Sequence, residues 1–386
     1  MKIGIISSPR VCVPPIGYGG AERVVYFLIK GLQELGHEVT LFGPRDSKVD
    51  CEVISVADTI SYAMTNEEES RYNLQTSQVL QEISSKVQEN IGRLDIINSH
   101  EEQFDLLPFK DFPHLQTLHN PFSNGFNTDK YYQAKDEIFY NSISHNQRRA
   151  FPILNYVATI YNGLDPDEFP INTDPKDYFA FIGRFSPVKS PNLAIWWAIK
   201  NNVPIKLAGN YNFQDNDYFH NEVEELLTRN NVEFIGETDM KMKIDLLSNA
   251  LANLHFIKFR EPFGLTVLEA GYMGTPTLAI KRGSMAELIE DGRTGVLVED
   301  FDEAIFKLQE IKAIDRGVVA TSFRRKFNYK IMASQYELVY KNVIDAFSQV
   351  NKKSLEVRDR QAFAKSSSSS VDKLYQELIR QIESSA

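Results

Sequence analysis

The chain has little cysteine, and this restricts the covalent and metal-based structures that it can form. Cys12 and Cys51 are the only cysteines among 386 residues, which is too few for a disulfide framework. Neither lies near histidines at a metal-ligand spacing, and no other group of histidines and carboxylates shows such a spacing. We therefore expect two structural thiols, no catalytic metal and no bound cofactor.

Long hydrophobic runs are absent as well. No segment approaches the roughly 18 to 20 apolar residues that a membrane-spanning helix needs. From Met1 the chain enters a strand-like run without the pattern of a signal peptide. These two absences predict a cytoplasmic protein.

Basic residues are in deficit, since 42 Lys and Arg stand against 52 Asp and Glu, a net charge of −10. The segment through Asp165 carries 14 basic and 21 acidic residues, a net charge of −7. An acidic surface repels phosphate backbones, so nucleic acid is not an expected partner. The charge gives no support to membrane association either, although a local pair such as Arg148-Arg149 is hidden in these totals.

Strand-like apolar segments alternate with helical patterns almost throughout, which is typical of parallel α/β sheets. A chain of 386 residues exceeds one ordinary hydrophobic core. We therefore predict two Rossmann-like, doubly wound domains that face each other across a cleft. Residues 1–162 form the first domain, and residues 163–328, which begin in a linker rich in Asp and Pro, form the second.

The first domain is predicted to open with a strand, a helix and a strand at Lys2–Ser7, Ala21–Leu35 and Glu38–Phe42. A polar loop is expected at Thr59–Glu69 and a long helix at Arg71–Asn90. Four further strands are expected at Asp95–Ser99, Leu115–Leu118, Ile138–Ile143 and Tyr156–Ile160.

The second domain repeats the alternation. Its strands are expected at Tyr178–Ile182, Ile205–Leu207, Val232–Ile235, Ala252–Phe256, Thr277–Ile280 and Gly295–Val298. Its helices are expected at Asn192–Lys200, Phe219–Arg229, Lys241–Ser248 and Phe301–Lys312.

The C-terminal part lies outside both domains. Residues 329–350 are predicted to form a helix, because Ile331–Phe347 carries an apolar and aromatic face that needs a partner. Residues 351–386 are predicted to form a polar linker with five serines at Ser366–Ser370, followed by an amphipathic tail helix from Val371 to Ile382. Two interpretations of the tail helix stay open, oligomerisation and packing onto its own chain.

The most informative segment is FREPFGLTVLEAGYMGTPTLAIKRG at 259–283, where Glu261 and Glu269 lie eight positions apart. A helix that starts near Phe263 or Gly264 places Glu261 in the loop before it and Glu269 about two turns inside it. The free N–H groups at Phe263, Gly264 and Leu265 suit a phosphate. A ligand with a sugar, a diphosphate and a ribose in a row would fit. The alternative is a buried helix whose glutamates are merely solvated.

Two cations follow the first strand of the second domain, in the segment from Gly183 to Lys189. Arg184 and Lys189 flank a strand-to-helix turn, which is where parallel sheets bind ligands. Together they can neutralise a diphosphate leaving group. The alternative is a pair of ordinary surface cations.

The first domain offers a glycine-rich turn and two histidines. Gly19 and Gly20 lie between the first strand and the first helix, where backbone can approach a ligand closely, but the G-x-G-x-x-G spacing of nicotinamide sites is missing. His119 follows a strand and precedes Asn120-Pro121, a place from which an imidazole can bind a substrate hydroxyl. His100 is a comparable candidate. A structural role is the alternative for both histidines.

In this order the motifs resemble those of the family 4 retaining glycosyltransferases, which have the GT-B fold. The resemblance covers residues 1 to 348. It rests on the Glu261/Glu269 segment and on PPIGYGGAE at 14–22, YNGLD at 161–165, GRFSPVKSP at 183–191 and AELIEDGRTGVLVED at 286–300.

The resemblance implies a role for each candidate. It implies that Arg184 and Lys189 bind the donor diphosphate, that Glu261 contacts the transferred sugar and that Glu269 holds the ribose. It further implies that His119 lies beside the reacting sugar. The phosphates would be contacted by the amides of Phe263, Gly264 and Leu265 and, from the opposite domain, by Gly19 and Gly20. The nucleobase would lie against the loop Gly236–Asp239, with contacts from Gly236 and Asp239.

The sequence departs from the family at one place. Ser190-Pro191 follows Lys189 where the family usually has glycine, and we expect an altered turn with the cation left in place. In the family, the helix Ile331–Phe347 would cross back onto the first domain.

The predicted activity is retaining transfer of a sugar from a nucleotide-diphosphate sugar, with a UDP-sugar favoured, to the hydroxyl of a carbohydrate or another acceptor. Bacterial-type glycan or glycoconjugate synthesis is the expected setting. A nucleotide-sugar epimerase of the same fold and a non-catalytic nucleotide-sugar-binding scaffold are the alternatives.

Overall fold

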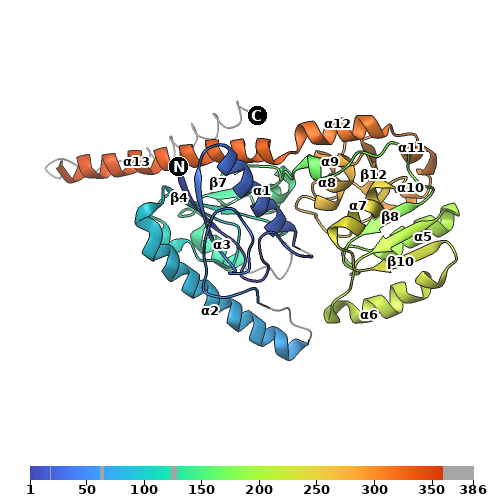
Figure 1. The fold of residues 1–386 in the computed structure, drawn as a ribbon, viewed down its shortest axis with the longest axis horizontal. Coiled ribbons are helices and arrows are strands. Elements are labelled where there is room, and N and C mark those ends of the chain that lie inside the picture. The colour runs from blue at the N-terminus through green and yellow to red at the C-terminus, as the bar shows by residue number, and fades with distance from the viewer. Residues whose placement is uncertain (18, 61–64, 123–127, 360–386) are drawn as a thin grey trace.

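The computed structural model describes residues 1–17, 19–60, 65–122 and 128–359. Within these residues the chain forms two parallel sheets in succession, of seven and six strands, with helices between the strands (Figure 1). The predicted α/β class with two doubly wound domains is therefore confirmed. Tyr18 of the glycine-rich turn, the Ser366–Ser370 linker and the tail helix lie outside the described residues.

The first sheet has the strand order β3-β2-β1-β4-β5-β6-β7. Its order reverses between β1 and β4, where Ile6 pairs with Ser99 at the carboxyl ends of both strands. The strands are β1 (Lys2–Ile6), β2 (Glu38–Phe42), β3 (Glu52–Ile54), β4 (Ile96–Ser99), β5 (His114–Thr117), β6 (Tyr140–Ser142) and β7 (Tyr156–Thr159). The helices are α1 (Gly20–Glu34), α2 (Asn66–Asn90), α3 (Thr128–Ala134) and α4 (His145–Ala150).

The second sheet has the order β10-β9-β8-β11-β12-β13, with its reversal between β8 and β11. The strands are β8 (Phe179–Ile182), β9 (Ile205–Ala208), β10 (Val232–Gly236), β11 (Asn253–His255), β12 (Thr277–Ile280) and β13 (Gly295–Val298). The helices are α5 (Pro191–Asn201), α6 (Asn216–Tyr218), α7 (Met240–Ser248), α8 (Leu265–Tyr272), α9 (Met285–Leu288), α10 (Phe301–Ala304), α11 (Leu308–Lys312) and α12 (Arg316–Lys326).

The last described helix, α13 (Tyr329–Asp359), leaves the second domain and lies along the first (Figure 1). Gly31 of α1 allows the two helices to approach closely, because a Cβ at Gly31 would come within 2.5 Å of the Cβ of Ala333. Tyr336 adds hydrogen bonds to the first domain. The helix thus crosses back as expected, and it continues past residue 350 into the segment predicted to be a linker.

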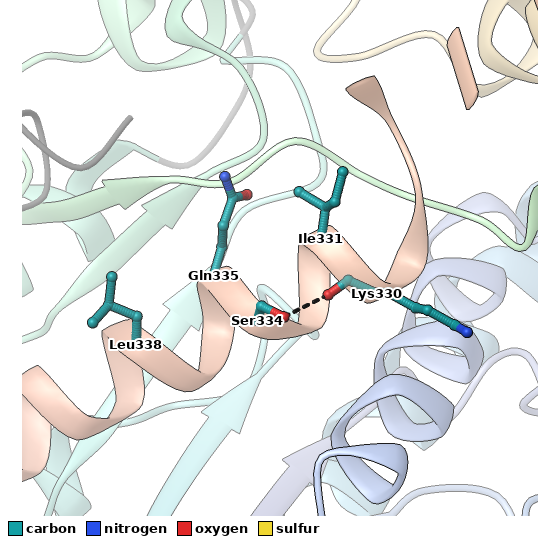
Figure 2. A pocket seen from close by; sticks show the side chains of 5 residues that line it. All are labelled: Lys330, Ile331, Ser334, Gln335 and Leu338. Carbon is teal, nitrogen blue, oxygen red and sulfur yellow. Dashed lines mark hydrogen bonds between the residues drawn. The ribbon is translucent and has the colours of Figure 1, made fainter. Parts of the chain in front are cut away.

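The outer surface of α13 carries a shallow depression lined by the five residues drawn in Figure 2, namely Lys330, Ile331, Ser334, Gln335 and Leu338. The Ser334 hydroxyl donates a hydrogen bond of 2.8 Å to the Lys330 carbonyl within the helix. No described helix combines the length and the hydropathy that crossing a membrane requires.

A carboxylate of the second domain joins the two domains. Glu287 of α9 accepts hydrogen bonds from the backbone N–H groups of His145 (2.8 Å) and Asn146 (2.7 Å) at the start of α4. The Tyr161 hydroxyl donates to the same carboxylate at 2.9 Å. A negative charge at a helix N-terminus is favourable because the first N–H groups lack partners inside the helix.

Several predicted elements differ from the observed ones. The prediction of a loop at Thr59–Glu69 is wrong from residue 66 onward, because α2 begins there. The Thr65 side chain caps this helix by accepting a hydrogen bond from the N–H of Glu68 at 3.2 Å. The α-helix expected at Phe219–Arg229 is replaced by a π-helical segment at Phe219–Val223 and a 3₁₀ segment at Glu224–Thr228. Two short helices, α10 and α11, replace Phe301–Lys312, and Phe306 at the break is 84% exposed, so packing does not hold a continuous helix there. The edge strand β3 is absent from the predicted strands, because it is too short to show a periodic pattern.

Candidate functional site

The candidate residues follow strands at the carboxyl edges of the two sheets. Arg184 and Lys189 come after β8, and Glu261 comes after β11, on either side of the reversal in the second sheet. Gly20 begins α1 after β1, and His119 comes after β5. Open parallel sheets bind ligands outside the carboxyl ends of their strands, at the reversal of strand order.

The starts of α1 and α8 lie against each other across the two domains. A Cβ at Gly20 would come within 2.9 Å of the Leu265 side chain. Gly264, which precedes α8, has a φ of 98°, a conformation that favours glycine. The first N–H groups of both helices have no partner inside the helix, so this contact brings together two helix N-termini of the kind that can bind a phosphate. The predicted phosphate roles of Gly19, Gly20, Phe263, Gly264 and Leu265 stay predictions.

Lys189 and Glu261 form one ion pair. The Lys189 Nζ lies 2.5 Å from Glu261 Oε2, and both side chains are largely buried, with exposed fractions of 25% and 12%. His255 Nε2 lies 3.8 Å from the same Glu261 oxygen. Burial lowers the pKa of His255 to about 4, with Glu261 acting in the opposite direction and Lys189 in the same one. The imidazole of His255 is therefore neutral at pH 7, beside the Lys189–Glu261 ion pair.

The turn after Lys189 keeps a conformation that glycine would favour. Ser190 has φ 52° and ψ 55°, in the left-handed region. Its hydroxyl donates a hydrogen bond of 2.8 Å to the Pro187 carbonyl. The serine hydroxyl thus supports the left-handed conformation at this position, and the altered turn relative to the family stays a prediction.

Among the described residues no hydrogen bond or ion pair joins Arg184 to the Lys189–Glu261 pair. Its Nε lies 3.3 Å from Asp215 Oδ2, and the Arg184 side chain is 46% exposed. Burial raises the pKa of Asp215, and Arg184 lowers it. The guanidinium is therefore accessible to a ligand, while Asp215 orients it.

Glu269 lies inside α8 and is almost completely buried, with 2% of its side chain exposed. It forms an ion pair with Lys243 of α7. A buried carboxylate is costly unless it is paired, so Lys243 explains how Glu269 is tolerated there. The ribose contact of Glu269 stays a prediction.

Both predicted nucleobase residues, one at the end of β10 and one in the loop after it, have structural roles. Gly236 has φ 84° and accepts a hydrogen bond from Gly209 N–H at 2.8 Å. The Asp239 carboxylate caps α7 by accepting the N–H of Met242 at 2.7 Å. The nucleobase contact of this loop stays a prediction.

His119 is held by backbone and side-chain hydrogen bonds. Glu102 Oε1 accepts the backbone N–H groups of His119 (2.6 Å) and Asn120 (2.7 Å). His119 Nε2 lies 2.9 Å from His100 Nδ1, and the two rings are stacked. Burial lowers the pKa of His119 to about 4, so the imidazole is neutral at pH 7.

Glu22, in the first turn of α1, is a buried acid next to Gly19. Burial raises its pKa to about 7, its own backbone N–H lowers it, and Glu101 raises it further. The pKa of Glu22 is therefore higher in the folded protein than in the unfolded chain. Between about pH 4.5 and about pH 7 the carboxyl is ionised in the unfolded chain but protonated in the folded protein, so the free energy of unfolding falls as the pH rises through this range. Glu22→Gln should raise the unfolding free energy by about 1 to 3 kcal/mol at about pH 8.5 and leave it unchanged near pH 4.5.

Urea unfolding of Glu22→Gln at the two pH values measures this difference, with the exposed Glu82→Gln as the matched control. The control should change stability little at either pH. An equal effect of Glu22→Gln at both pH values would contradict the raised pKa.

Two protein-family models match this chain. Residues 18–168 match the model described as Glycosyltransferase Family 4, and residues 165–329 match the model described as Glycosyl transferases group 1. Together the two matches run from 18 to 329 without a gap, across both doubly wound domains. The chain belongs to the family 4 type of GT-B glycosyltransferases.

This glycosyltransferase is similar in sequence to several named proteins. It is 23% identical over 345 residues to spore coat protein SA of Bacillus subtilis (strain 168), a match that covers 78% of this chain and 86% of that protein. It is 33% identical over 132 residues to a D-inositol 3-phosphate glycosyltransferase of Mycolicibacterium paratuberculosis, covering 33% of this chain and 30% of that enzyme.

Solved structures of glycosyltransferases share its fold. Anabaena HepE in complex with UDP and glucose has a TM-score of 0.64 at 19% identity, covering 88% of this chain and 99% of that one. Sucrose-phosphate synthase from Thermosynechococcus elongatus has a TM-score of 0.69 at 18% identity, covering 89% of this chain and 99% of that one. The predicted GT-B architecture is therefore confirmed.

Sequence reasoning missed several partners of this glycosyltransferase site. His255 is the last residue of β11, at the edge that also holds the other candidates. The strand predicted at Ala252–Phe256 placed His255 inside the strand, so the rule that selected His119 did not select it. Lys243, Asp215 and Glu102 carry no indication in the sequence, because only the folded chain brings them to their partners. Among residues 1–17, 19–60, 65–122 and 128–359 no three His, Cys, Asp or Glu side chains are grouped so as to hold a metal ion. The expectation that no metal or cofactor is needed stays a prediction.

Proposed function

We propose that this glycosyltransferase moves a sugar from a UDP-sugar to an acceptor hydroxyl with retention of anomeric configuration. The Lys189–Glu261 pair is the observation that carries the proposal. It holds a cation and a hydrogen-bond acceptor at the carboxyl ends of β8 and β11, close to the start of α8. A diphosphate beside a sugar needs this combination. The UDP bound to the structural relative HepE supports the choice of nucleotide.

In the proposed complex each group has one task. Lys189 and Arg184 neutralise the diphosphate, and the Glu261 carboxylate accepts hydrogen bonds from hydroxyls of the transferred sugar. Because negative charge on the phosphate grows as the sugar departs, the two cations stabilise the transition state more than the ground state. Neutral His119 contacts the reacting sugar from the other domain.

The reaction exchanges one bond at the anomeric carbon for another. The bond from that carbon to the phosphate oxygen breaks, and a bond to the acceptor oxygen forms on the same face. The departing diphosphate takes the proton of the acceptor hydroxyl, so the atoms balance without a further reactant.

The acceptor is proposed to be a carbohydrate or another hydroxyl compound, in bacterial-type glycan or glycoconjugate synthesis. Relatives named as D-inositol 3-phosphate glycosyltransferases support a small hydroxylated acceptor. The cytoplasm stays the proposed location. Neither an epimerase nor a non-catalytic scaffold is favoured by the matching families, and multiple-turnover release of free nucleotide would separate an enzyme from a scaffold.

Thermal unfolding with UDP, GDP, ADP and their sugars tests the donor. At equal concentrations, a ligand that binds the folded state more tightly raises the unfolding midpoint further, so UDP and one UDP-sugar should give the largest increases. Release of UDP from that sugar in the presence of candidate acceptors then measures transfer. An increase with GDP or ADP instead of UDP would overturn the choice of nucleotide.

Arg184→Ala should lower the turnover of the preferred sugar nucleotide by about 10²-fold, because a half-exposed guanidinium that Asp215 orients is lost from the leaving group. The exposed Arg229, which pairs with Glu225 in the same domain, supplies the matched control Arg229→Ala. Steady-state release of nucleotide measures both variants. Undiminished transfer by Arg184→Ala would remove Arg184 from the diphosphate site.

A further inference from the structure

A chain of buried hydrogen bonds starts at Asn98, at the carboxyl end of β4. Its Nδ2 group donates to the carbonyls of Leu115 (3.0 Å) and Ser99 (3.3 Å) and to the Thr117 hydroxyl (3.2 Å). These acceptors fix the orientation of the amide, so Oδ1 is the atom that faces the other way. Oδ1 accepts the hydroxyl of Tyr340, a residue of α13, at 2.7 Å.

The orientation of Asn98 determines the tautomer of His100. His100 Nε2 lies 3.2 Å from Asn98 Oδ1. An amide oxygen can only accept, so His100 Nε2 must carry the proton. In a neutral imidazole the other nitrogen is then an acceptor, and His100 is neutral because burial lowers its pKa well below the usual value, with His119 acting in the same direction.

The tautomer of His100 in turn determines that of His119. His100 Nδ1, which lies 2.9 Å from His119 Nε2, has no proton to donate. His119 Nε2 must therefore donate, and the neutral ring of His119 has a bare Nδ1. None of the described residues donates a hydrogen bond to that Nδ1. His119 is also less buried than His100, which is 5% exposed.

We propose that His100 is a positioning residue that holds His119 in the tautomer protonated at Nε2, so that His119 Nδ1 accepts a hydrogen bond from a substrate hydroxyl. This inference rests on the proposed function, which places His119 beside the reacting sugar. A bare ring nitrogen can only accept, so the substrate group that it contacts must donate a hydrogen bond, and in a sugar that group is a hydroxyl. Asn98 and Tyr340 set the direction of the whole chain, which makes the crossover helix α13 part of the arrangement.

Nuclear magnetic resonance of the whole protein with nitrogen-15-labelled histidine reports the tautomer directly and does not depend on activity. The chain has 7 histidines, so the ring signals are few, and His119→Gln assigns those of His119. At about pH 7.5 we expect His119 to carry its proton on Nε2. A proton on Nδ1 of His119 in the unmodified protein would overturn the proposal.

Two substitutions of His100 separate positioning from packing. His100→Gln can accept from His119 Nε2 through its oxygen and donate to Asn98 Oδ1 through its amide, in the same order as the histidine. His100→Leu fills a similar volume but offers neither group. We expect His100→Leu to shift His119 toward the other tautomer and to lower kcat/KM by about tenfold, the order of one lost hydrogen bond. His100→Gln should restore both properties to near their original values.

The outcomes are distinguishable. An unchanged His119 tautomer in His100→Leu, or equal losses of kcat/KM in the leucine and glutamine variants, would overturn the role of His100. A His119 protonated at Nε2 in a protein that turns over no sugar nucleotide would overturn the proposed function while leaving the tautomer assignment intact.

Discussion

Replacing Lys189 with alanine should lower the turnover of the preferred sugar nucleotide by about 10² to 10³-fold. Two effects combine in this variant. The diphosphate loses the cation of Lys189, which lies with Glu261 in a largely buried site. Glu261 loses the ammonium group that lies 2.5 Å from its carboxylate. A carboxylate left without its cation would repel the departing diphosphate, so we expect a larger effect than for Arg184.

The control for Lys189→Ala is Lys281→Ala, which removes an exposed lysine paired with Glu299 in the same domain. Exposed ion pairs contribute roughly 0 to 1 kcal/mol, so this control should retain activity and stability. Single-turnover rates measure the chemical step separately from donor binding. A Lys189→Ala enzyme with a higher KM but an unchanged single-turnover rate would show that Lys189 binds the ground state only.

Replacing Arg316 with alanine should destabilise the second domain by about 3 to 5 kcal/mol. The guanidinium is buried and donates four hydrogen bonds to three different segments. Its partners are the carbonyls of Asn172 (2.6 Å), Ala250 (2.7 Å) and Ser248 (2.7 Å) and the Thr275 hydroxyl (2.8 Å). Burial lowers the pKa of Arg316 to about 10, so it stays charged at neutral pH. Alanine removes all four donors. The Ser248 carbonyl keeps a hydrogen bond from the Asn172 side-chain amide at 3.1 Å, but the other three acceptors lose the guanidinium, and each such loss costs about 1 to 3 kcal/mol if water does not replace it.

Thermal or urea unfolding measures the effect of Arg316→Ala. For a domain of this size a loss of 3 kcal/mol corresponds to roughly 6 to 12 °C in the unfolding midpoint. Arg325 is exposed on the same helix, and Arg325→Ala should change the midpoint little. A similar, small change in both variants would show that water satisfies the acceptors around Arg316.

The fold was largely predictable from local pattern. Strand-like runs such as Glu38–Phe42 and Thr277–Ile280 have the same bounds in the structure, because strands buried on both faces of a parallel sheet are continuous apolar runs. The errors occurred where local pattern is weak. The cap at Thr65, the exposed break at Phe306 and the short edge strand β3 depend on single contacts or on neighbours that a window of sequence does not contain.

The positions of the candidate residues in the fold were also predictable, although their contacts were not. Residues that follow the strands of a parallel sheet all emerge at one edge, so Arg184, Lys189 and Glu261 could be assigned to one region from sequence alone. Their partners could not. Arg184 contacts Asp215 and Glu269 contacts Lys243, and in both cases the two residues come from different elements whose relative positions depend on the packing of the whole domain.

By itself, the sequence determined the alternation of strands and helices, the positions of the strand ends and the glycines that open helices at those ends, since each of these depends on neighbouring residues. Only the tertiary structure decided which side chains meet. Lys189 and Glu261 are 72 positions apart, and Asn98 and Tyr340 are 242 positions apart. Contacts over such separations form when both domains have packed and α13 has crossed back, because hydrogen bonds and ion pairs require specific distances that no local preference sets.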